Sequence, residues 1–112
     1  MLAVKVHHIA LRTNRRRALE RFYGETLGLP TIQKTTRSTW LDAGGTIVMI
    51  EKRGRGEPAI PKGSLELLAF AVTKRAHAAL RKKLAIEAST EFTSYFRDPD
   101  GRRVAVSHYR RS

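Results

Sequence analysis

The residues best suited to chemistry in this chain of 112 residues are histidines and carboxylates, because the chain has no cysteine. That absence excludes a disulfide framework, a Cys-ligated zinc site and a cysteine nucleophile. His8 lies in an apolar stretch, and an imidazole with an ordinary pKa near neutrality serves as a general base or a hydrogen-bond partner. Glu51 ends the apolar run Thr46–Ile50. A carboxylate there must reach solvent or find a partner, and we expect that partner to be His8.

Several aromatic, methionine and arginine side chains on the expected strands are further candidates. Such residues line ligand pockets or contact anions when they face a cleft, although aromatic residues and methionine on strands more often belong to the core, and arginine is more often solvated. The candidates of this kind are Trp40, Met49, Tyr95, Arg37, Arg97 and Arg103. His7 is expected to face away from the cleft, and His77 is expected on the exposed or flanking side of a helix. Neither receives a role.

The first half of the chain predicts the element order β-α-β-β-β. Residues 4–11 are rich in apolar and β-branched residues and predict a strand. Thr13 and Asn14 are good N-caps for an amphipathic helix that Gly28 and Pro30 end. Short strands are expected over residues 31–33, 38–41 and 46–51, with a turn at 42–45.

The second half repeats this order after a linker at residues 53–63, where glycines and prolines lie among charged neighbours. A strand is expected over residues 65–72. Thr73 then caps a helix whose apolar stripe is Ala76, Leu80 and Leu84. Strands over 91–97 and 103–108 flank a turn at 98–101. The agreement in element order predicts two copies of one unit, module one at 1–52 and module two at 64–112.

Three stretches carry a resemblance to a known family. They are Val6-His7-His8-Ile9-Ala10-Leu11, then Ala18-Leu19-Glu20-Arg21-Phe22-Tyr23 with Leu27-Gly28-Leu29, and Arg97-Asp98-Pro99-Asp100-Gly101-Arg102-Arg103-Val104. Together they resemble the vicinal oxygen chelate superfamily, which includes glyoxalase, bleomycin-resistance proteins and extradiol dioxygenases. The resemblance implies an α+β fold in which two βαβββ modules form a curved mixed sheet around a cleft, within a single domain over residues 1–112.

In metal-dependent members of that superfamily, the cleft holds a divalent ion, typically on one His and one Glu from each module. The resemblance places His8 and Glu51 at the ligand positions of module one, as candidate catalytic and metal-binding residues. Leu67 and Ala105 replace the ligands of module two, so the resemblance implies a degenerate metal site. The candidate ligand-binding residues are Trp40, Met49, Leu67, Tyr95, Arg103 and Ala105.

Two other residues of module two could in principle bind a metal, but we expect their side chains to point away from the cleft. Glu66 and His108 have the opposite strand parity from Leu67 and Ala105, which directs them toward the helix layer or solvent. We therefore favour a protein of the glyoxalase/bleomycin-resistance/dioxygenase type that binds a small organic molecule in a cleft with a degenerate metal site, where His8 and Glu51 remain, and we expect no cofactor rather than a divalent metal. An enzyme would instead be a lyase or dioxygenase-like metalloenzyme that uses Zn, Ni, Mn or Fe. The other alternative is a metal-free binding or sequestering module, since Leu67 and Ala105 make the cleft more apolar.

The formal net charge of +12 comes from 22 Lys and Arg against 10 Asp and Glu. A basic surface of this size allows nucleic-acid binding as a third alternative, but the basic residues are spread over the chain and form no nucleic-acid motif. The charge instead favours neutral or anionic ligands. We expect a homodimer in the cytoplasm, because no membrane span or signal peptide is visible and a monomer would leave sheet edges to be covered.

Overall fold

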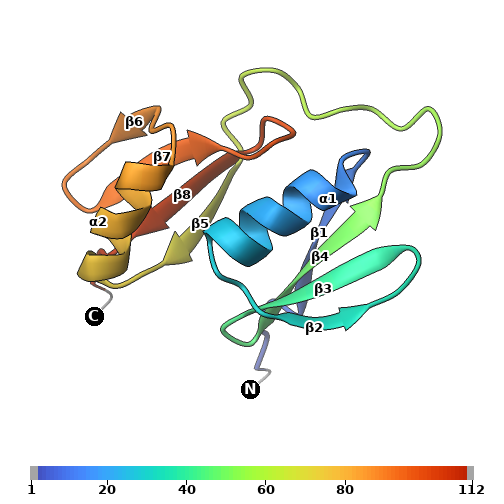
Figure 1. Ribbon diagram of the computed structural model, residues 1–112, viewed down its shortest axis with the longest axis horizontal. Helices are drawn as coiled ribbons and strands as arrows, with labels where there is room; N and C mark the ends of the chain where they lie inside the picture. The colour runs from blue at the N-terminus through green and yellow to red at the C-terminus, as the bar shows by residue number, and fades with distance from the viewer. Residues whose placement is uncertain (1–2, 111–112) are drawn as a thin grey trace. The chain divides into compact units, whose positions relative to one another are not determined.

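A computed structural model describes residues 3–110, and over this range each half of the chain forms a four-stranded mixed sheet (Figure 1). Two compact units divide the chain, Met1–Pro58 and Ala59–Ser112, which we call the first and the second module. Their boundary falls within residues 53–63, where the sequence predicts a linker. Each module has the order β-α-β-β-β, which confirms the predicted fold class of two βαβββ modules.

The first module builds its sheet in the strand order β1-β4-β3-β2. Strands β1 and β4 pair in parallel and the other pairs are antiparallel. Its helix is α-helical in its first turn (α1) and continues directly as a π-helix (η1). The elements are β1 (His8–Thr13), α1 (Arg16–Leu19), η1 (Glu20–Thr26), β2 (Thr31–Lys34), β3 (Ser38–Ala43) and β4 (Thr46–Lys52).

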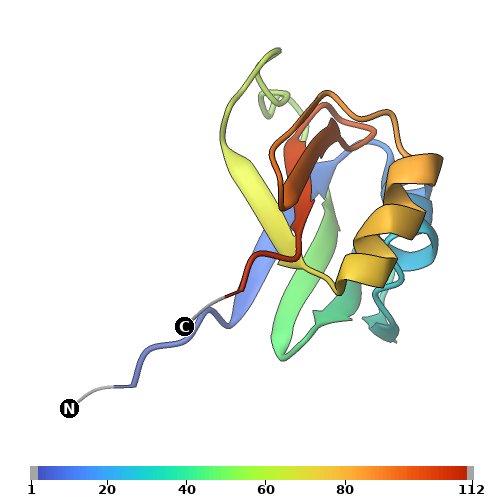
Figure 2. The ribbon, with the colours of Figure 1, turned by 90° about the vertical axis from the view of Figure 1, so that its left-hand side faces the viewer.

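The second module repeats this topology with the strand order β5-β8-β7-β6, and α2 lies along one face of the sheet (Figures 1 and 2). Strands β5 and β8 pair in parallel, as β1 and β4 do. The two-residue strand β6 is not predicted from the sequence, because two residues are too short to show a strand pattern. The elements are β5 (Leu67–Ala71), α2 (Lys74–Lys83), β6 (Ala88–Ser89), β7 (Thr93–Arg97) and β8 (Arg103–Ser107).

Each core lies between a helix and one face of its sheet. In the first module, Leu19 and Tyr23 are fully buried, as are the alternate residues Val48 and Ile50 of β4. In the second, Leu80 of α2 is buried together with Phe96, Val104 and Val106 on the strands. Strand residues alternate between the two sheet faces, so the opposite parity lies on the face away from the helix. We call this second face of each sheet its open face.

Strand β1 begins later than the sequence predicts. Val4 and Val6 are 88% and 59% exposed and lie before the strand, although their β-branched side chains favour one. The strand starts at His8, just after the His7 carbonyl accepts from the Ile47 amide at 3.1 Å, and it runs on to Thr13. Pairing with β4 thus decides where β1 lies, and local propensity does not.

The expected N-caps of the first helix, Thr13 and Asn14, are wrong. Arg15 occupies the cap position and its side chain makes no capping hydrogen bond, and the Thr13 hydroxyl instead accepts from the Arg15 amide at 2.8 Å. The Arg16 guanidinium donates to the carbonyls of Thr35, Thr36 and Ser38 at 2.6–2.8 Å, which ties the first turn to the β2–β3 loop. The hydroxyl of Thr13, the last residue of β1, therefore bonds the backbone just before the helix, in place of a side-chain N-cap on the helix itself.

The cap of the second helix and the last turn agree with the sequence. The Thr73 hydroxyl accepts from the Ala76 amide at 3.1 Å, as an N-cap does. Asp98 is buried and its carboxylate accepts from the amides of Asp100 and Arg102 at 2.9 and 3.0 Å. Gly101 has a φ of +88°, which explains why glycine ends this turn.

Candidate functional site

The eight residues that the sequence analysis proposes as site residues all lie on the open faces of the two sheets. The strand registers place His8, Trp40, Met49 and Glu51 on one face in the first module, because the residues between them are those buried against the helix. In the second module, the registers place the remaining four on the open face in the same way. These are Leu67, Tyr95, Arg103 and Ala105.

The structure does not bring His8 and Glu51 together. His8 lies opposite Ile47 and Glu51 lies opposite Arg12, four residues further along both strands. At about 3.3 Å per residue, this separates the two backbone positions by about 13 Å. Glu51 instead forms an ion pair with Arg12, whose Nη1 lies 3.3 Å from Oε1. The expectation that His8 partners Glu51 is therefore wrong.

Arg12 joins two carboxylates at the end of β1. Its Nη2 donates to Glu57 Oε1 at 2.7 Å, and the Gly54 amide donates to the same oxygen at 3.0 Å. These hydrogen bonds, that of Arg12 first, lower the pKa of Glu57 to about 2. Sequence reasoning missed Arg12, although it shares strand parity with His8. Glu51 thus belongs to an ion-pair cluster and is not an isolated ligand.

His8 has a different neighbour. Its Nδ1 lies 2.8 Å from Nδ1 of His7, and the two rings meet edge to face with centroids 5.1 Å apart. Both side chains are exposed. His8 therefore offers an accessible imidazole on the open face of the first sheet, next to β4.

The residues at the open faces do not fit a resident divalent metal. The registers pair Ala10 with Met49 and Ala69 with Ala105, so the counterpart of Ala105 in the first module is Met49 rather than Glu51. Of the corresponding positions His8, Met49, Leu67 and Ala105, only His8 is a ligand for a divalent cation. Within residues 3–110 no group of three or more His, Asp or Glu side chains could hold a metal ion. A catalytic zinc site normally needs three protein ligands.

Trp40 and Met49 lie opposite one another on β3 and β4 and are half-buried. The Trp40 indole Nε1 donates to the Ser38 hydroxyl at 3.2 Å, which fixes the ring on the open face. Arg37, a candidate for anion contact, is exposed and precedes β3, outside the strands. The open face of the first sheet thus offers an aromatic ring, a thioether and an imidazole.

The open face of the second sheet carries a guanidinium stacked on a ring. The Arg103 guanidinium carbon lies 4.2 Å from the centroid of the Tyr95 ring, a cation–π distance. Arg103 Nε is buried without a hydrogen-bond partner among the described residues, and its ion pair with Glu87 is long, at 3.7 Å. Leu67 lies opposite Arg103 and is 45% exposed. Ala105 is fully buried opposite Tyr95, so it can support the ring but is not accessible itself.

Arg97, the third arginine considered for anion contact, has structural partners. Its Nη1 donates to the carbonyls of Ser64 and Gly101 at 2.6 and 3.2 Å, and its Nε donates to Glu87 at 3.2 Å. These bonds tie the loop after the linker to the last turn. Arg97 therefore has a structural role in the second module, whereas the Arg103 guanidinium forms no hydrogen bond with another described residue.

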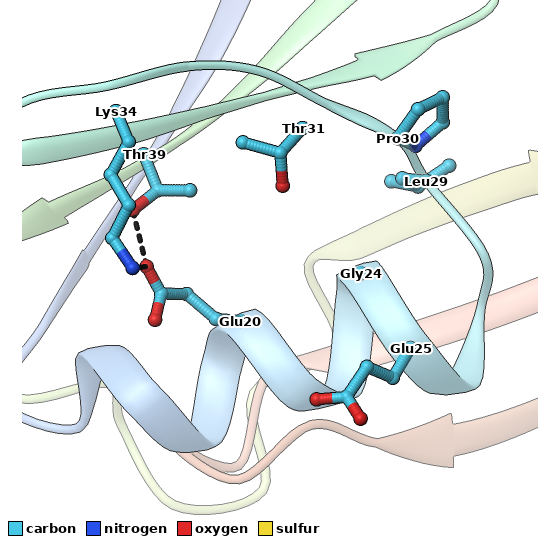
Figure 3. A pocket seen from close by; sticks show the side chains of 8 residues that line it. All are labelled: Glu20, Gly24, Glu25, Leu29, Pro30, Thr31, Lys34 and Thr39. Carbon is cyan, nitrogen blue, oxygen red and sulfur yellow. Dashed lines mark hydrogen bonds and ion pairs between the residues drawn. The ribbon is translucent and has the colours of Figure 1, made fainter.

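On the helix side of the first sheet, a pocket of about 310 Å³ lies around Glu20, beside Gly24 (Figure 3). Glu20 Oε2 accepts from Thr39 Oγ1 at 2.5 Å and from Lys34 Nζ at 3.1 Å. Burial opposes ionisation, but these bonds and the nearby charges of Lys34 and Arg16 lower the pKa of Glu20. In Figure 3 the Thr31 hydroxyl points into the hollow above Gly24. Sequence reasoning did not identify this site.

His77 is buried, so the expectation that it lies on the exposed or flanking side of its helix is wrong. It is 3% exposed, and its Nε2 lies 2.7 Å from the hydroxyl of Ser94 on β7. Its Nδ1 lies 2.7 Å from Nδ1 of His108. This contact confirms that His108 faces the helix layer. Burial first, then the charges of His108 and Arg81, lower the pKa of His77.

The family model of the Glyoxalase/Bleomycin resistance protein/Dioxygenase superfamily matches residues 5–106. The chain belongs to this superfamily. The match spans both modules and confirms the resemblance to vicinal oxygen chelate proteins. A comparison with curated proteins finds no match.

Solved structures share the fold of this superfamily member. A glyoxalase/dioxygenase from Nostoc punctiforme is 25% identical, with a TM-score of 0.72, over 91% of this chain and 88% of that one. A lactoylglutathione lyase from Agrobacterium tumefaciens is 18% identical, with a TM-score of 0.71, over 94% and 93%. The oxidase ChaP-H2 is 17% identical, with a TM-score of 0.75, over 97% and 96%. Within residues 3–110, neither helical segment is long and apolar enough to span a membrane.

Proposed function

We propose that this superfamily member binds a small neutral or anionic organic molecule at the open faces of its sheets, without a resident metal. The observation that carries the proposal is the patch formed by Leu67, Tyr95 and Arg103 on the second sheet. An exposed aliphatic side chain there lies opposite a guanidinium that stacks on a ring and forms no hydrogen bond with another described residue. A planar ligand with an acidic group would gain both a stacking surface and a charge-assisted hydrogen bond.

The open face of the first sheet offers ligand contacts of its own in this proposal. Trp40 and Met49 offer apolar surface, and the exposed His8 offers a hydrogen-bond donor or acceptor. Glu51 contributes through its ion pair with Arg12 and thus limits the positive charge of this face. The chain's surplus of cations attracts anionic ligands at long range.

The proposal is tested by thermal unfolding with a library of small organic acids and neutral aromatic compounds, in excess chelator. A ligand at one hundred times its dissociation constant should stabilise the protein by about 2.7 kcal/mol. Arg103→Gln should reduce the stabilisation by acids, because it removes the cation of the open face. Arg75→Gln, which removes an exposed arginine of α2 away from the open face, should retain it. If no library member stabilises the protein in chelator, or both variants respond alike, the proposal fails.

A second candidate function rests on helix α2, which carries five basic residues and no acidic one. Its cations are exposed, and none of them forms an ion pair with another described residue. Such a surface could hold a polyanion such as nucleic acid. This function requires binding to DNA at low salt that weakens steeply as salt rises, so an unchanged electrophoretic mobility at low salt would dispose of it.

A further inference from the structure

A chain of hydrogen bonds crosses the core of the second module from β6 to the end of β8. The Ser89 hydroxyl lies 3.2 Å from that of Ser94, which lies 2.7 Å from Nε2 of His77. The other nitrogen of His77 contacts Nδ1 of His108 at 2.7 Å. Ser94 and His77 are buried, whereas Ser89 is exposed and His108 is half-buried. The chain therefore links two surface positions through a buried imidazole.

The histidine at the end of this hydrogen-bond chain, His108, lines a pocket of about 330 Å³ on the helix side of the second sheet. No side chain within residues 3–110 hydrogen-bonds its Nε2. The cavity is lined by Lys74, His77, Ala78, Arg81, Glu91, Phe92 and His108. Its volume is at the lower end of the range for small-molecule sites.

The groups of this hydrogen-bond chain can all donate toward His108 or all donate toward Ser89, and the net charge is the same in both arrangements. One of the two Nδ1 atoms must donate to the other, so a single proton lies between them. The neutral imidazole that accepts carries its own proton on Nε2. If Ser94 donates to His77, then His77 donates to His108, and His108 carries its own proton on Nε2. In that tautomer the pocket receives an N–H donor from a neutral histidine. The lowered pKa of His77 supports a neutral imidazole at the centre of this hydrogen-bond chain.

The charges around the pocket favour an anion. Lys74 and Arg81 come from α2 and Glu91 comes from the loop before β7, so two cations face one carboxylate. Neither Lys74 nor Arg81 has an ion pair or a side-chain hydrogen bond to another described residue. The ring of Phe92 forms an apolar wall, and it meets His108 edge to face with centroids 5.3 Å apart. A ligand that suits all these groups combines a carboxylate with an aromatic ring.

We propose that this pocket is a second ligand site, separate from the open faces, which binds a small aromatic carboxylate. Lys74 and Arg81 hold the carboxylate, His108 Nε2 donates a hydrogen bond to it, and Phe92 packs against the ring. The buried pair of His77 and Ser94 orients His108, and the bound carboxylate selects the tautomer with the proton on Nε2.

Helix α2 supplies matched controls for a test. Lys74, Ala78 and Arg81 follow one another at helical spacing and line the pocket. Arg75, Ala79 and Lys82 form the neighbouring exposed stripe, outside the pocket lining. A change at each pocket position thus has a counterpart one residue later with similar exposure, charge and helix propensity. Leucine in place of Ala78 fills the pocket, whereas leucine in place of Ala79 does not.

The experiment titrates the full chain with sodium benzoate and follows the imidazole nitrogen and Phe92 amide signals by NMR. Acetate and benzyl alcohol serve as probes that lack the ring or the charge. Benzoate should shift the His108 Nε2 signal saturably. Each control probe should bind at least about tenfold more weakly, because benzyl alcohol loses the charge-assisted contact and acetate loses the ring that packs against Phe92. Ala78→Leu should abolish the shift, and Ala79→Leu should leave the dissociation constant within about twofold.

A second pair of variants covers the case in which Ala78→Leu does not fold. Arg81→Ala should weaken benzoate binding at least about tenfold, and Lys82→Ala should change it less than about twofold. Arg103→Gln, which alters the open face, should leave the His108 titration unchanged, so the two proposals fail independently. A shift that does not saturate, equal effects of pocket and control variants, or loss of the shift in Arg103→Gln would overturn the second site.

Discussion

Replacement of His77 by leucine should destabilise the second module by about 2–4 kcal/mol. The wild-type imidazole makes two hydrogen bonds of 2.7 Å, each with a net worth of about 1 kcal/mol. The bond to Ser94 costs more than this net worth when it is lost, about 1–3 kcal/mol in all, because leucine leaves the fully buried Ser94 hydroxyl with only the longer contact to Ser89. Leucine is close to histidine in size, so little of the effect comes from a cavity.

The assay must report on the second module alone. The single tryptophan, Trp40, lies in the first module, so its fluorescence does not follow the unfolding of the second. Urea titrations at pH 8 followed through the NMR amide signals of β7 and β8 give the required free energy of unfolding. His7→Leu, at an exposed histidine of the first module, is the control and should change that free energy by less than about 0.5 kcal/mol.

A double-mutant cycle with Ser94→Ala isolates the buried hydrogen bond. Because the double variant leaves no unsatisfied hydroxyl, its cost should be smaller than the sum of the single costs by at least about 1 kcal/mol. Additive costs, or a loss below about 1 kcal/mol for His77→Leu, would refute the account of His77 as a satisfied buried group.

Three further predictions concern Gly24, Asp98 and the pH dependence of the His77 contribution. Gly24→Ala should stabilise the first module by up to about 1 kcal/mol in urea unfolding, because the new Cβ would meet only the Leu29 carbonyl, at 3.8 Å; destabilisation would show that the π-helix requires glycine. Asp98→Ala should cost about 2–4 kcal/mol, since it removes the buried acceptor of the Asp100 and Arg102 amides and one of the two carboxylates that pair with Arg102, at 3.1 Å; a loss under about 1 kcal/mol in the same assay would contradict this. The stability that His77 contributes should be fully present above about pH 6.5 and fall as pH drops below it, because its folded pKa is lowered and the unfolded chain then binds more protons. Wild type and His77→Leu, compared from pH 8 to pH 5.5, should therefore converge, and parallel curves would exclude this linkage.

Strand parity was enough to place the site residues on one face of each sheet, because alternation is a local property of the chain. The register between paired strands could not be predicted from the sequence in the same way. The pairing of β1 with β4 joins segments far apart in the sequence, and it puts Arg12, not His8, opposite Glu51. The prediction that those two residues meet assumed a register that local patterns do not determine. The later start of β1 has the same cause.

His77 shows a signal that was present in the sequence but was not used. It lies three residues before Leu80, which lies four before Leu84, and this is the spacing of a buried helix stripe. Its polar side chain argued against burial, yet Ser94 supplies the hydrogen bond that makes burial favourable. The stacking of Arg103 on Tyr95 could be anticipated only once both residues were known to share a sheet face.

The central claim is that the open faces bind an organic ligand without a metal. The most direct test is a crystal structure of the protein grown with zinc, nickel, manganese or ferrous iron and with an organic acid that stabilises it, measured with anomalous data. The account predicts ligand density against Arg103 and Tyr95, and no anomalous peak within bonding distance of His8. A metal ion bound by His8 and a carboxylate, with the organic acid coordinated to that metal, would contradict it.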